Sequence, residues 1–266
     1  MLIFILFTTA FASSIVDIVN SNPNSTWIAT DYPDGIVFAN GQFAQEPTQL
    51  DDELKAQEFG SLSKANDLPE NYDVRKQYPG AILPTRDQGD KCQASWAIAV
   101  AQVFGAKMGM QGCSKGLLSV QQLISCHEDQ LGCIKGATQD AWQYMTRSKG
   151  ITTEHCFPFT SQHGKVPPCP TRCINGSEIE RTILTETKVL MGTAEQYQQA
   201  IFDSGPFTMF MDIYEDFLHY KSGIYQHVTG DKTAQIFVIV IGWGIEDKVP
   251  YWICQGVYGV QFGEEV

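Results

Sequence analysis

Hydrophobic and polar positions are patterned differently in the two halves of the chain. Residues 96–107 are apolar on most faces and predict a buried helix, and residues 137–149 predict another, closed by Gly150. Three later runs are rich in β-branched and aromatic residues: FTMFMDIY from Phe207, IFVIVIG from Ile236 and YWICQ from Tyr251. Helices first and strands later indicate an α+β architecture, with a helical lobe, a sheet lobe and a cleft between them.

Capping residues define two more helices. Ser119 precedes a short helix that ends near Cys126. Thr193 and Gln196 have the spacing of a capping box before YQQAIFD, and Gly205 ends that helix. These signals place both boundaries without reference to any tertiary contact.

The first 66 residues differ from the rest. An apolar run over residues 2–7, followed by the small-x-small pattern Ala10-Phe11-Ala12, predicts a signal peptide over residues 1–12. Residues 13–66 are polar and broken by prolines, and they look like a segment appended to a domain over residues 67–266. No later run reaches the ~18 apolar residues of a membrane span, so we expect no membrane association after signal removal.

Charge and composition restrict the function. The chain has 266 residues, 43% of them hydrophobic, which suits a globular core, and its 30 acidic and 18 basic side chains give a net charge of -12. This balance argues against nucleic acid or anionic membranes as partners. We expect a monomer in the secretory pathway, extracellular or in a lysosome- or vacuole-like compartment. Sequons at Asn24 and Asn175 fit secretion.

Cysteine usage agrees with an oxidising compartment. The eight cysteines are Cys92, Cys113, Cys126, Cys133, Cys156, Cys169, Cys173 and Cys254. Some of them, with His155, could imitate a zinc cluster, but disulfides are the commoner use of such cysteines in a secreted chain. We therefore predict disulfides, no metal and no cofactor.

Several segments resemble the papain family, in its cathepsin-B-like branch. They are DLPENYDVRKQYP (67–79), RDQGDKCQASWA (86–97), SKGITTEHCFPF (148–159) and YEDFLHYKSGIYQHVTG (214–230), with IGWG and PYWI. The similarity is collinear from Leu68 to the end of the sequence. It implies a two-lobed papain-like fold, with a helical left lobe and an antiparallel sheet or barrel as right lobe. Residues 13–66 then resemble a cathepsin-B-type propeptide; a disordered leader is the alternative.

The resemblance also assigns active-site positions. Family members use a helix-terminal Cys thiolate, a His, an orienting Asn and a Gln of the oxyanion hole. Motif by motif, Gln88 takes the oxyanion position, Cys92 the structural cysteine, and Ser95 the nucleophile. The His position falls on Ile236 and the Asn position on Gly256. Three catalytic residues are therefore replaced.

A serine at this position needs a base, because a hydroxyl is a weak nucleophile. Ile236 cannot supply one, and His227 lies in YQHVTG, where relatives have a His outside their catalytic machinery. Loss of the nucleophile or base of a triad costs about 10⁶-fold in turnover, roughly 8 kcal/mol. Either Ser95 retains weak hydrolysis with an unanticipated group, or it serves as the helix N-cap, the interpretation that we favour.

The expected substrate cleft has changed too. Where the family has Cys-Asn-Gly-Gly, this chain has Cys133-Ile134-Lys135-Gly136, so Lys135 brings a long cationic side chain beside Gly136, unless it points to solvent. Tyr258 stands where the family has a Trp. The sequence ends at GVQFGEEV, before the expected closing strand, so the domain is expected to be C-terminally short.

By resemblance, the disulfides pair Cys92 with Cys133, Cys126 with Cys169, and Cys156 with Cys173. Each would stabilise the fold by ~2 to 4 kcal/mol. Cys113 and Cys254 are expected to be free and buried; a bridge between them is the alternative.

Two functions remain open. The first is a catalytically inactive cathepsin-B-like homologue whose cleft binds peptides, propeptides or cystatin-like inhibitors. The second is an active or weakly active endopeptidase that uses Ser95 or an unanticipated group.

Overall fold

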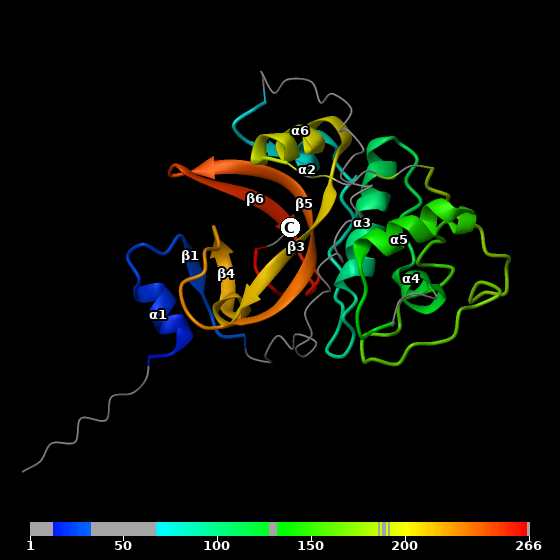
Figure 1. Ribbon diagram of the computed structural model, residues 1–266, viewed down its shortest axis with the longest axis horizontal. Coiled ribbons are helices and arrows are strands. Elements are labelled where there is room, and N and C mark those ends of the chain that lie inside the picture. Colours follow the sequence, from blue (N-terminus) through cyan, green and yellow to red (C-terminus); the bar gives the residue numbers. More distant parts are fainter. Residues whose placement is uncertain are drawn as a thin grey trace, which may run out of the picture.

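The computed structural model describes residues 13–32, 68–127, 132–185, 187, 190 and 192–264. The predicted signal peptide and most of the predicted propeptide lie outside these ranges. Within them the chain forms two lobes, with the helices α3, α4 and α5 on one side and the long curved strands on the other (Figure 1). The predicted order of helices before strands is confirmed.

The helical lobe is built around α3 (Ser95–Met110), which is apolar on nearly every face and buried over most of its length. α4 (Val120–Cys126) begins where its cap predicts, since the Ser119 side chain accepts from the Gln122 amide. α5 (Thr138–Tyr144) continues as a π-helical turn, Met145–Lys149, that ends at Gly150 with φ of 58°. The helix predicted over residues 137–149 is therefore real but changes its hydrogen bonding midway.

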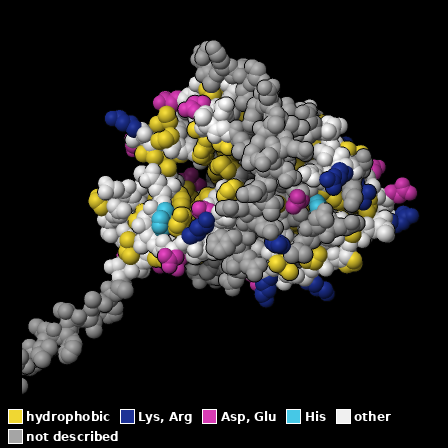
Figure 2. Space-filling view, viewed as in Figure 1, with side chains coloured by type: hydrophobic (Ala, Val, Ile, Leu, Met, Phe, Trp, Pro, Cys, Tyr) yellow, Lys and Arg dark blue, Asp and Glu magenta, His cyan; other side chains and the backbone are white. Residues whose placement is uncertain are grey.

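The sheet lobe is a mixed arrangement of short and long antiparallel strands. The central strand β5 (Lys232–Glu246) pairs with β2 (Tyr72–Asp73), β3 (Phe207–Tyr214) and β6 (Val249–Gln255). All three predicted strand runs are confirmed. No closed barrel forms among the described residues, so the barrel expected as an alternative to the sheet is wrong. Hydrophobic side chains border a hollow in this lobe (Figure 2).

Two helices flank the sheet. α2 (Val74–Gln77) follows β2 directly, and α6 (Ala194–Ser204) lies beside it at the upper edge of the lobe (Figure 1). Thr193 and Gln196 form the predicted capping box, and the Gly205 amide donates to the carbonyl of Ile201 at the other end. A 3₁₀ turn (Glu215–His219) links β3 to β4.

The N-terminal segment docks on the sheet lobe. α1 (Ile15–Ser21) is followed by β1 (Trp27–Ala29), which pairs antiparallel with β4 (Tyr220–Gly223). Trp27 is 4% exposed, and its indole nitrogen donates to the carbonyl of Gln226 at 2.8 Å. Its ring contacts the rings of Tyr220 and Tyr225. The single Trp of this segment thus anchors it to the domain.

The three disulfides expected from the resemblance are all present: Cys92–Cys133, Cys126–Cys169 and Cys156–Cys173. Cys113 and Cys254 are free, so the alternative bridge between them does not form. Cys113 was expected to be buried and is exposed, because it follows the turn at Gly112 that ends α3. Cys254 is partly buried and packs against the core.

None of the helices in the described ranges is long and apolar enough to cross a membrane. Within the same ranges, no three His, Cys, Asp or Glu side chains are grouped so that they could hold a metal ion.

Candidate active site

The N-terminus of α3 is the first part of the site. α3 begins at Ser95, and its N-cap is Ala94, which makes no side-chain cap hydrogen bond. The prediction that Ser95 is the N-cap is therefore wrong. The helix starts one residue earlier than that prediction requires, so Ser95 stands inside the first turn and its hydroxyl is available for a contact elsewhere.

That contact joins the two lobes. The Ser95 Oγ accepts a hydrogen bond from the backbone amide of Phe237 on β5, at 3.2 Å. Ser95 is 6% exposed, and this is the one hydrogen bond that its side chain makes with described residues. The serine oxygen is thus fixed as an acceptor for the neighbouring strand.

Ile236 lies next to Phe237 in β5, and it is also buried. Its register partner is Met211 on β3, so two apolar side chains occupy this part of the sheet. An aliphatic side chain can neither accept nor donate a proton. At this point β5 therefore presents a backbone N–H donor and an aliphatic side chain to Ser95, and neither can act as a base.

All five histidines of the sequence lie in the described ranges, and none hydrogen-bonds Ser95. His227 is the one that could have been considered as a base. Its Nδ1 lies 3.2 Å from Asp216 Oδ1, and its ring stacks on Tyr214 with centroids 3.8 Å apart. His227 therefore lies on the loop after β4 and contacts Asp216 and Tyr214.

Gln88 and the segment after β6 form the second part of the site. The backbone amide of Gln88 donates to the carbonyl of Val257 at 2.9 Å, and Asp87 forms a β-bridge with Tyr258. Gln88 is 4% exposed, and no described residue donates to its buried Oε1. A Cβ on Gly256 would meet only Tyr258 Cδ2, at 3.9 Å, which is an ordinary contact.

Tyr258 is buried and packs edge-on against Phe262, with ring centroids 5.3 Å apart. Burial raises the pKa of its phenol well above the ordinary value. The phenol is therefore neutral at physiological pH. It contributes packing to the site and no charge.

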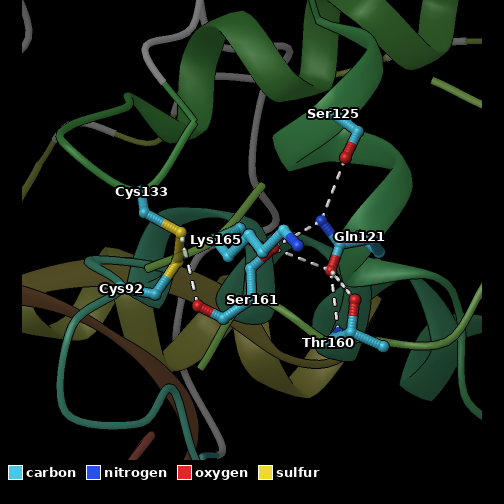
Figure 3. The surroundings of a disulfide bond; sticks show 7 residues. All are labelled: Cys92, Gln121, Ser125, Cys133, Thr160, Ser161 and Lys165. Carbon is cyan, nitrogen blue, oxygen red and sulfur yellow. Dashed lines mark hydrogen bonds between the residues drawn. A yellow bond between two sulfur atoms is a disulfide. The ribbon is translucent and has the colours of Figure 1, made fainter. Parts of the chain in front are cut away.

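The third part is the loop that the Cys92–Cys133 disulfide holds (Figure 3). The backbone amide of Gln93 donates to the carbonyl of Cys133 at 2.9 Å, and this bond holds the loop beside the start of α3. Behind it, buried Gln121 joins Ser125, Thr160 and Ser161 through hydrogen bonds. After Cys133, Gly136 is buried and Lys135 half-buried, so the lysine is partly covered and not freely extended into solvent.

The structure brings most predicted site residues together. One hydrophobic cluster contains the disulfide Cys92–Cys133 with Trp96, Ile236, Val257 and Tyr258, whose chain positions span most of the domain. Ser95 precedes Trp96, and Gln88 hydrogen-bonds Val257, so the three segments of the predicted site meet at this cluster.

Two buried glutamines beside the site were not predicted from the sequence. Gln102 Nε2 on α3 donates to the carbonyl of Pro84 at 2.8 Å, and Gln255 Nε2 at the end of β6 donates to the carbonyl of Leu83 at 2.8 Å. Both side chains are buried. They tie both lobes to the segment that leads to Gln88. A Gln inside an apolar helix is the one signal that could have revealed this contact.

The two free thiols have different surroundings. Burial raises the pKa of Cys254 to about 12, so that thiol stays protonated at neutral pH. Cys113 lies beyond the far end of α3 from Ser95, and its thiol donates to the carbonyl of Met108 at 3.3 Å.

Comparison with known proteins decides the family. The profile described as papain family cysteine protease matches residues 68–266. The chain belongs to the papain family. This confirms the resemblance read from the motifs, and the match begins at the residue where the collinear similarity starts.

Papain-family relatives with cathepsin-B-like names are prominent among the similar proteins. Cathepsin B-like CP2 of Giardia intestinalis is 31% identical over 220 residues, which cover 77% of this chain and 70% of the relative. Human tubulointerstitial nephritis antigen is 30% identical over 304 residues, with 95% and 60% covered. The solved structure of proCathepsin B S9 from Trypanosoma congolense has a TM-score of 0.79 at 25% identity, covering 96% of this chain and 90% of that one. The two-lobed papain-like fold is thereby confirmed.

Proposed function

We propose that this protein is a catalytically inactive, cathepsin-B-like member of the papain family that keeps a peptide-binding cleft. It enters the secretory pathway and acts outside the cell or in a lysosome-like compartment. Three disulfides support that compartment, because cytosolic thiols are kept reduced. The names of similar proteins include both cathepsin B-like proteinases and an antigen, so these names alone do not distinguish an enzyme from an inactive homologue.

The observation that carries the proposal is the hydrogen bond from the Phe237 amide to Ser95 Oγ. A serine becomes a nucleophile when a base removes its proton. Here the contact on the strand is an N–H donor, which withdraws electron density from the oxygen, and Ile236 beside it cannot act as a base. Catalysis through Ser95 would require a partner that the described residues do not provide.

The binding part of the proposal rests on the walls of the site. No described residue donates to the buried Gln88 Oε1, so a peptide N–H could pair with this acceptor if ligand binding exposed it. The loop held by the Cys92–Cys133 disulfide, which includes Gly136, is the second part of the proposed cleft. Peptides, propeptides and cystatin-like inhibitors are the ligands with the required extended backbone.

We also infer that residues 13–66 are a propeptide. β1 pairs with β4, and Trp27 is buried against Tyr220 and Tyr225, so the described residues 13–32 are bound to the domain through their backbone and an aromatic anchor. The chain covers 90% of a procathepsin B structure, which supports the same assignment. A leader without structure would not make these contacts.

The test measures hydrolysis and binding separately on purified protein after removal of the N-terminal segment. The account predicts no cleavage of dibasic or hydrophobic fluorogenic peptides above the rate of the Ser95→Ala variant. Turnover that Ser95→Ala abolishes would replace this function with that of a serine-dependent endopeptidase. Peptides and a cystatin-like inhibitor should raise the thermal unfolding midpoint, because a ligand that binds only the folded state stabilises it. If neither does, the cleft binds no such ligand.

A further inference from the structure

We propose that Asn175 carries an N-linked glycan when the chain is made in a secretory pathway. Asn175-Gly176-Ser177 has the acceptor pattern of N-glycosylation. The proposal goes beyond the function of the cleft and requires only secretory entry, which the disulfides support.

The asparagine side chain is placed for modification. Asn175 is exposed, and its Oδ1 accepts a hydrogen bond from the Ser177 amide at 3.0 Å. This contact uses the oxygen of the side-chain amide. The Nδ2 atom, to which a glycan bonds, has no hydrogen-bond partner among the described residues. Ser177 is exposed as well, so neither end of the sequon is engaged in packing.

The turn that carries the sequon can hold a bulky group without disturbing the fold. The Cys156–Cys173 disulfide fixes its start, and the Cys173 amide donates to the carbonyl of Ser177 at 3.0 Å. Gly176 has φ of 84°, and a Cβ built there would meet no atom within 4 Å. Residues 174–178 are all exposed, so the outer side of the turn has room for a bulky group.

Ile174 gives the glycan a local role. It precedes Asn175 and is 76% exposed. A sugar attached to the next residue would cover part of this apolar surface. The surface of the helical lobe would then present a polar glycan over part of this exposed hydrophobic side chain.

The modification is a group transfer with no change in oxidation state. The donor is an oligosaccharide carried on a lipid pyrophosphate, and the cell's transferase provides catalysis. Asn175 Nδ2 forms a bond to C1 of the first sugar, the bond from C1 to the phosphate oxygen breaks, and lipid pyrophosphate leaves. The nitrogen loses one proton.

The second sequon provides an internal control. Asn24 is exposed, but it lies in the N-terminal segment, and the hydroxyl of Thr26 in its sequon donates to the carbonyl of Ile224. The variant Asn24→Gln removes this sequon and leaves residues 173–177 unchanged.

The test expresses the full chain in a eukaryotic secretory host and compares its mass before and after peptide N-glycosidase. Asn175→Gln and Ser177→Ala should each lose the same single glycan, whereas Ser177→Thr and Asn24→Gln should keep it. Alkylation of free thiols reports secretory entry independently. An unmodified residue 175 in a chain with all three disulfides formed overturns the glycan alone. An unmodified residue 175 in a chain with reduced cysteines overturns both the glycan and secretory entry.

Discussion

The Phe237 amide donates to the Ser95 hydroxyl across the boundary between β5 and α3, at 3.2 Å. Both residues are buried, so the contact is screened from solvent. The hydroxyl thus works as a structural link between the lobes, in the position that the family resemblance gives to a nucleophile.

Ser95→Ala is expected to destabilise the protein. The Phe237 N–H would remain buried without its acceptor, which costs about 1–3 kcal/mol. Urea unfolding should show this loss in the free energy of unfolding. Ser114→Ala is the matched control, because Ser114 accepts from the Gly116 amide on the exposed surface, and it should change stability by less than about 0.5 kcal/mol. Equal effects of the two substitutions would contradict a structural role for Ser95.

Trp27→Ala should release the N-terminal segment. Truncation of a buried Trp costs about 3–5 kcal/mol, and here it also removes the hydrogen bond to Gln226. Hydrogen exchange should accelerate at the Thr30 amide, which donates to the carbonyl of His219. Ile28→Ala changes the neighbouring residue of the same strand, which is 54% exposed, and should leave exchange almost unchanged. Unaltered protection in Trp27→Ala would show that the aromatic anchor does not hold the segment.

The Asp216 carboxylate gives the sheet lobe a pH dependence. Burial acts to raise its pKa, but hydrogen bonds outweigh this and hold the pKa below the ordinary value. The donors are Tyr225, Val228, Thr229 and His227. A lowered folded pKa means that the stabilisation is complete above the unfolded pKa of about 3.9 and is lost as pH falls through the folded pKa.

Asp216→Asn should therefore destabilise the protein at pH 5, by about 2 kcal/mol, because a charged acceptor of several hydrogen bonds is lost. The difference in free energy of unfolding between this variant and the wild type should become smaller as pH falls from 5 to 3. Asp231→Asn, which removes an exposed carboxylate nearby, serves as control. A gap that stays constant over this range would mean that Asp216 is not stabilised as the anion.

The two free cysteines should react very differently. Cys113 is exposed, whereas burial raises the pKa of Cys254 to about 12, so Cys254 has almost no thiolate at pH 7. A thiol reagent should label one cysteine in the native protein and the second only after unfolding. Cys113→Ser should remove the native reaction. Rapid native labelling of Cys254 would instead identify an activated thiol, and the account of the site would need revision.

Local signals in the sequence were sufficient for much of the fold. The caps at Ser119 and Thr193 depend on side chains within three residues, so sequence spacing predicted them correctly. The disulfides followed from the family resemblance. The barrel did not form among the described strands, because closure depends on pairing between strand edges that no local pattern encodes.

The site shows the same limit. The motifs assign active-site positions to Gln88, Ser95 and Ile236, and these assignments stay predictions, whereas the helix cap assigned to Ser95 was wrong by one residue. Its true partner, the Phe237 amide, is a backbone group on a strand 142 positions away, and backbone donors leave no trace in a sequence. The exposure of Cys113 likewise depends on where the chain turns after α3.

The most direct test of the central claim is reaction of the wild-type protein with a fluorophosphonate, which bonds to activated serines. Intact mass and peptide mapping would locate any adduct, with Ser95→Ala as control. We expect no adduct on Ser95, because its oxygen accepts a hydrogen bond from Phe237 and no described histidine hydrogen-bonds it. An adduct on Ser95 in the wild type that disappears in Ser95→Ala would contradict it.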